Sequence, residues 1–105
     1  MKTMNAIEII RKTRDRHELT ETEINWLVDR FVQGEVVDSQ MSAWAMAVTI
    51  NGLTDDETYH LTKAMFQSGQ SLGIQSQSPL VDKHSTGGVG DNTSLILAPL
   101  LACFE

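Results

Sequence analysis

The chain has 105 residues, with 14 acidic side chains against 8 basic ones, a net charge of −6 when histidine is neutral, and 41% apolar residues. This composition is typical of one modest globular domain, and the acidic surplus argues against nucleic acid as the main partner, because phosphate backbones require clustered lysine and arginine. No apolar run is long enough to span a bilayer, and the single cysteine, Cys103, cannot form an internal disulfide, so we expect a small buried thiol in a reducing compartment, the cytoplasm.

Capping signals mark the first two predicted helices. Asn5 can cap a helix that ends near the charged turn 14–17 and whose apolar positions are Ile7, Ile9 and Ile10. Thr20 and Glu23 form a Thr-x-x-Glu capping box, in which each side chain satisfies a backbone N–H at the helix start. Behind the box, one apolar stripe follows the helical period: Ile24, Leu27, Val28, Phe31 and Val32. Gly34 supplies the left-handed residue that ends such a helix.

Two further helices follow. Asp38 or Ser39 can cap the third, which an Asn-Gly pair ends and whose packing side carries Met41, Trp44, Ala45 and Val48. Its alanines, Ala43, Ala45 and Ala47, would allow close helix approach. Thr54 and Glu57 repeat the capping box, and the buried side of the fourth helix carries Leu61, Ala64 and Met65 before Gly69 ends it. Because the connections are short, we expect neighbouring helices of this 1–69 helical domain to pack against each other.

The character of the chain changes after the fourth helix. Residues 70–79 are polar, rich in serine and glutamine, and without period, which predicts a hinge or linker. Residues 80–84 can form one strand, a glycine-rich turn follows, and the next helix carries Ser94 to Leu97, with Pro99 expected to kink or shorten it. The predicted fold class is mainly α: a helical bundle, then over 80–105 the first strand, turn and helix of a truncated α/β domain.

The glycine-rich turn is where the chemistry concentrates. Its glycines let backbone N–H groups converge on one point, and the following helix adds its free N-terminal N–H groups and positive dipole end. Lys83 contributes a full charge, and hydroxyl groups come from Ser85, Thr86, Thr93 and Ser94. The lysine precedes the glycines, so this is no P-loop, and the last glycine of a dinucleotide fingerprint is missing. The pattern predicts a local phosphate cradle in an acidic protein.

These residues carry a resemblance to a known family. Residues 81–91, Val-Asp-Lys-His-Ser-Thr-Gly-Gly-Val-Gly-Asp, resemble the phosphate-binding signature of thymidine and pyrimidine-nucleoside phosphorylases, and the match continues through 93–99. Residues 40–43, 52–57 and 67–69 resemble the helical N-terminal segment of the same family. Nearly the whole chain is covered.

The resemblance implies a pentosyltransferase that catalyses reversible phosphorolysis of a pyrimidine (deoxy)nucleoside to the free base and (deoxy)ribose 1-phosphate. It implies a homodimer formed through the helical domain, and inorganic phosphate as co-substrate without an organic cofactor. By position, the phosphate contacts would be Lys83, Ser85 and Ser94. His84 would lie beside the nucleoside and polarise the departing pyrimidine. Backbone carbonyls at Gly90 and Asn92 match a monovalent-cation site, for potassium.

Two other interpretations stay open. Anthranilate phosphoribosyltransferases share a helical N-terminal domain and a glycine-rich loop, but Lys-His-Ser ahead of Thr-Gly-Gly is not expected in them. A helical interaction module without activity, built from residues 5–69, is the alternative from a different class. Members of the phosphorylase family are several times longer, so we expect these 105 residues to be a fragment that is inactive by itself.

Overall fold

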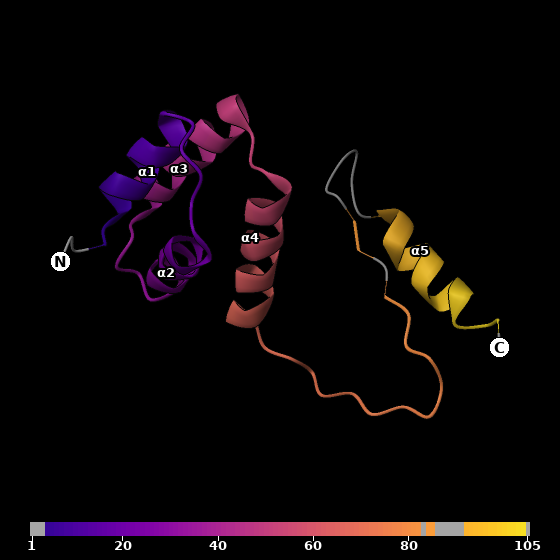
Figure 1. The fold of residues 1–105 in the computed structure, drawn as a ribbon. Helices are drawn as coiled ribbons and strands as arrows, with labels where there is room; N and C mark the ends of the chain where they lie inside the picture. Colours follow the sequence, from indigo (N-terminus) through magenta and orange to yellow (C-terminus); the bar gives the residue numbers. More distant parts are fainter. Residues whose placement is uncertain (1–3, 83, 86–91, 105) are drawn as a thin grey trace. The chain divides into compact units, whose positions relative to one another are not determined.

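The computed structural model describes residues 4–82, 84–85 and 92–104. Within these residues the chain forms α1 (Ala6–Arg14), α2 (Glu21–Val32), α3 (Asp38–Asn51), α4 (Asp55–Ser68) and α5 (Asn92–Leu101) (Figure 1). The chain divides into two compact units, Met1–Ser71 with α1 to α4, and Leu72–Glu105 with α5. The mainly α fold class is confirmed.

Side-chain caps begin three of the four helices in the first unit. The Asn5 Oδ1 accepts from the Glu8 N–H at 2.9 Å, and both predicted Thr-x-x-Glu boxes form, at α2 and at α4. The prediction for α3 is wrong: its N-cap is Val37, not Asp38 or Ser39. The Val37 N–H donates to the Gln40 Oε1 at 3.2 Å, so the amide of Gln40 satisfies the helix start without a hydroxyl or carboxylate at the cap.

Left-handed residues follow three of the helices. Gly34 and Gly52 have φ of 79° and 76°, as expected for glycine after a helix. After α1 the same position is taken by Arg16, with φ of 60°. There the His17 N–H donates to the Lys12 carbonyl at 2.8 Å, which closes the α1 terminus as a glycine would. Gly69 also ends its helix, with an ordinary φ of −85°.

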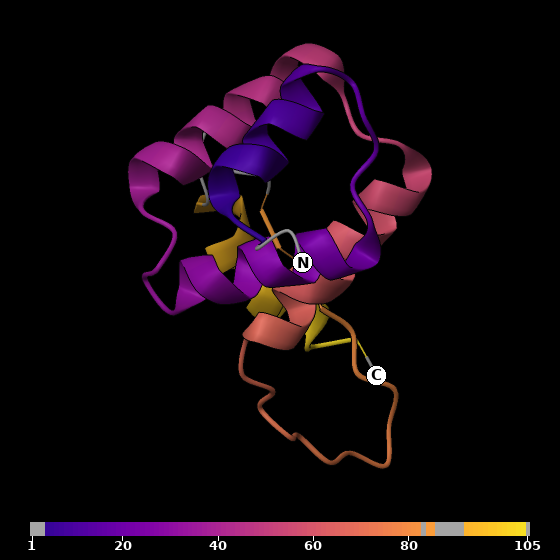
Figure 2. The same cartoon turned by 60° about the vertical axis from the view of Figure 1, so that its left-hand side comes forward.

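The helices of the first unit pack in two pairs, α1 against α3 and α2 against α4 (Figures 1 and 2). Helices adjacent in sequence contact each other little: the contact between α1 and α2 is small, and those of α2 with α3 and of α3 with α4 are smaller still, so the expectation that sequence neighbours pack together is wrong. The physical reason lies in the connections, where Leu19 and Val36 are buried and anchor the chain in the core. When a connection residue is buried in the core, the helix that follows crosses the core and does not fold back against the helix before it. The buried core consists of Ala6, Ile9, Leu19, Ile24, Leu27, Val28, Val36, Trp44 and Ala64.

Several apolar positions predicted to be buried are exposed instead. Ile7, Phe31, Val32 and Met65 are exposed, as are Ala43 and Ala45 on α3. The apolar stripe of α2 is longer than the surface its partner covers, so its last turn stays open. The result is an apolar groove of about 390 Å³ between α2, α3 and α4, lined by Val28, Phe31, Val32, Met41, Trp44, Leu61, Met65 and Ser68.

In the second unit, residues 80–82 and 84–85 adopt no regular secondary structure. A strand is held by hydrogen bonds to another strand, and the described residues contain none, so the strand over 80–84 stays a prediction. Helix α5 continues past Pro99 and ends at Leu101. Cys103 is exposed, and its thiol donates to the Pro99 carbonyl at 3.3 Å, so the expectation that it is buried is wrong.

Candidate functional site

The first part of the candidate phosphate segment is the pair His84 and Ser85. His84 is exposed, Ser85 is half-buried, and the His84 Nδ1 lies 3.3 Å from the Ser85 carbonyl oxygen. A carbonyl oxygen can only accept, so this contact is a hydrogen bond in the tautomer whose Nδ1 carries the proton. Lys83 and Gly90, two of the predicted site residues, lie outside the described residues.

The second part is the first turn of α5, where Asn92 and Ser94 lie. Ser94 is half-buried and Asn92 is exposed. The first N–H groups of a helix have no acceptor within it, and its dipole gives this end a partial positive charge. The first turn of α5 carries no acidic side chain, unlike the first turns of α1, α2, α3 and α4. The start of α5 therefore suits an anion electrostatically.

The charge distribution of the sequence makes Lys83 distinctive. It is the only lysine or arginine that follows Lys63 in the chain. Between these two residues lie only polar, apolar and acidic side chains, with Asp82 directly before Lys83. Within this segment, Lys83 is therefore the one lysine or arginine that can offer an anion a full positive charge, and hydroxyl and N–H groups can complete the contact.

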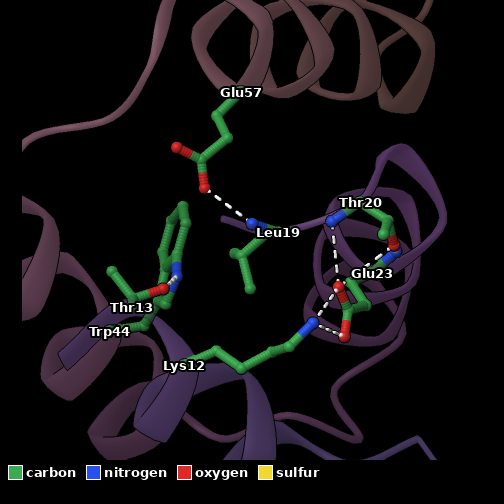
Figure 3. Close-up of polar contacts among 7 residues, drawn as sticks. All are labelled: Lys12, Thr13, Leu19, Thr20, Glu23, Trp44 and Glu57. Carbon is green, nitrogen blue, oxygen red and sulfur yellow. Dashed lines mark hydrogen bonds and ion pairs between the residues drawn. The ribbon is translucent and has the colours of Figure 1, made fainter. Parts of the chain in front are cut away.

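The helical unit holds a second concentration of polar contacts, centred on Glu57 (Figure 3). This carboxylate is 7% exposed. One oxygen accepts from the Leu19 N–H at 2.8 Å, and the other accepts from the Thr54 N–H at 2.9 Å and the Thr54 hydroxyl at 3.1 Å. Glu57 thus caps α4 and ties it to the connection between α1 and α2. The capping half follows from the Thr-x-x-Glu spacing, whereas the bond to Leu19 has no signal in the sequence.

Glu23 has the equivalent double role at the start of α2. Its carboxylate caps Thr20 and also binds the Lys12 Nζ of α1 at 2.8 and 2.9 Å (Figure 3). Burial by itself would raise the pKa of Glu23, but the hydrogen bonds from Lys12 and from the Thr20 backbone and hydroxyl outweigh it and hold the pKa below its ordinary value. The charge pair adds to the small contact between α1 and α2.

Trp44, expected in the core or an interface, lies in the core at 6% exposed. Its indole N–H donates to the hydroxyl of the buried Thr13 at 3.1 Å, which joins α3 to α1 (Figure 3). These contacts in the helical unit satisfy one another and serve the fold.

Within the part of the chain that the structure describes, no group of three histidine, cysteine, aspartate or glutamate side chains could hold a metal ion. The same residues contain no helix that is both long and apolar enough to cross a membrane.

Comparison with known proteins gives two findings. Residues 7–69 match the family described as glycosyl transferase family, helical bundle domain. The pyrimidine-nucleoside phosphorylase of Staphylococcus aureus (strain MSSA476) is 48% identical over 103 residues, which are 97% of this chain and 24% of that protein. The pyrimidine-nucleoside phosphorylase of Geobacillus stearothermophilus is 45% identical over 100 residues, 94% of this chain and 23% of that protein.

The chain therefore spans about a quarter of the length of these curated relatives. The matched family covers α2, α3 and α4 completely and α1 from its second residue, and the relatives extend the match through the glycine-rich segment. The resemblance seen in the sequence is confirmed, and the chain belongs to the glycosyl transferase family that is defined by this helical bundle domain.

Proposed function

We propose that this chain supplies the helical unit and the phosphate-binding segment of a pyrimidine-nucleoside phosphorylase. The reaction is the reversible phosphorolysis of a pyrimidine (deoxy)nucleoside to the free base and (deoxy)ribose 1-phosphate, a pentosyl transfer. The observation that carries the proposal is the 45–48% identity to proteins of that name over nearly the whole chain, the glycine-rich segment included.

Phosphate is the group that this segment would hold. Lys83 supplies the full charge, Ser85 and Ser94 carry hydroxyl groups, and the start of α5 adds the positive end of its helix dipole. Glycosidic cleavage builds positive charge on the sugar and negative charge on the leaving base. A phosphate dianion at the anomeric carbon is both nucleophile and counter-charge, so positioning and electrostatics provide most of the catalysis.

His84 is proposed to stabilise the departing pyrimidine. In the tautomer whose Nδ1 donates to the Ser85 carbonyl, a neutral ring has Nε2 as an acceptor. Nε2 can therefore donate to the negative base only when the ring is an imidazolium. The proposed role is thus that of a charged hydrogen-bond donor, which strengthens as charge develops on the base.

The remaining parts of the proposal concern the cation and the cofactor. Backbone carbonyls of Gly90 and Asn92 would contribute to a potassium site, in keeping with the preference of that ion for neutral oxygen ligands. Asn92 is the first residue of α5, beside the proposed phosphate contacts. No organic cofactor is part of the proposal, and the lone cysteine supports a cytoplasmic location.

A homodimer formed through the helical unit is also proposed. Between Ser39 and Asn51, α3 carries no charged side chain, and its outer face exposes Met46 and Ile50 at 60% and 71%. In a chain with a net charge of −6, an uncharged face is one on which two copies meet without charge repulsion. This face supports dimerisation independently of catalysis.

The test is a chimera in which this chain replaces the matched segment of the Geobacillus stearothermophilus relative. We expect phosphate-dependent release of uracil or thymine from nucleosides. Lys83→Ala should lower the rate by about 100-fold and raise the KM for phosphate, because it removes the only lysine or arginine of the segment. Lys63→Ala is the matched control: it removes an exposed lysine paired with Glu21 at 3.0 Å and should leave the rate within about twofold.

Circular dichroism and size-exclusion chromatography establish that each chimera is folded. A folded chimera without phosphate-dependent release would contradict the proposal, and so would a Lys83→Ala variant with unchanged kinetics. Release that requires a nucleoside 5′-phosphate and pyrophosphate, instead of a nucleoside and phosphate, would favour a phosphoribosyltransferase. Dimerisation without any turnover would favour the interaction module.

A further inference from the structure

We draw no further inference here: the strongest candidate, the apolar groove that α2, α3 and α4 line with Phe31, Val32, Met41, Leu61 and Met65, carries nothing because nothing in the structure shows what covers it.

Discussion

Replacing Glu57 by alanine tests whether one buried carboxylate holds the two helix pairs together. The change removes the acceptor of the Leu19 N–H, which is 2.8 Å from the carboxylate in a residue that is 5% exposed. A buried donor left without a partner costs about 1–3 kcal/mol. Loss of the α4 capping contact adds about 0.5–1 kcal/mol, since the exposed N–H and hydroxyl groups of Thr54 can form hydrogen bonds to water instead. The expected loss is about 2–4 kcal/mol.

Urea unfolding of the full chain, followed by circular dichroism, measures this loss. A unit of about 70 residues has a free energy of unfolding of roughly 4–10 kcal/mol, so Glu57→Ala takes a large share of it. Glu57→Gln keeps one neutral acceptor and should lose about half as much, which provides a second measurement if the alanine variant unfolds. Asp56→Ala, at the exposed neighbouring position, should stay within about 0.5 kcal/mol of the parent.

Hydrogen exchange at the Leu19 amide gives a readout specific to this bond. In the parent chain the amide should be protected, and in Glu57→Gln its protection should fall more than that of the α1 amides. A Glu57→Ala variant within 0.5 kcal/mol of the parent, with Leu19 still protected, would refute the reasoning.

Three further predictions concern the fold. Because the pKa of Glu23 is lowered in the folded chain, the stabilisation that its carboxylate provides is complete above the ordinary carboxyl pKa and is lost as pH falls through the lower, folded-state pKa. Between pH 7 and pH 3, the free energy of unfolding measured in urea should therefore fall less for Glu23→Gln than for the parent. Equal decreases in the two chains would contradict this. Trp44→Phe and Thr13→Val should each destabilise the chain, with a coupling of about 1 kcal/mol in a double-mutant cycle by thermal unfolding; strict additivity would exclude the hydrogen bond. Gly34→Ala should lower the free energy of unfolding measured in urea by about 1 kcal/mol, because φ at this residue is 79°. Gly69→Ala, where φ is −85°, should leave it nearly unchanged. Equal decreases for the two variants would show that φ is not the cause.

Features decided within a few residues could be predicted from the sequence. The two Thr-x-x-Glu boxes and the glycine after α2 depend on side chains and backbone groups at most four positions apart, so spacing alone reveals them. The pairing of helices could not be predicted this way. It depends on Leu19 and Val36, which look like ordinary connection residues and are buried because helices from distant parts of the chain enclose them.

The candidate site also has features that could be predicted from the sequence and features that could not. The residue types and their order around Lys83 predict a phosphate-binding segment, and phosphate binding there stays a prediction. The contact between the His84 Nδ1 and the Ser85 carbonyl, at 3.3 Å, could not be predicted, since it depends on the local backbone conformation.

The alternating helix pairs also set the order in which this chain can fold during synthesis. The hydrogen bonds of the helical unit join residues far apart in the sequence: Thr13 and Trp44 are 31 residues apart, Leu19 and Glu57 are 38 apart, and Glu21 and Lys63 are 42 apart. A growing chain that has completed α2 must therefore keep its apolar stripe without a partner until α4 has left the ribosome. Stable folding of the unit waits for its last helix, and the nascent chain up to that point is a substrate for chaperones.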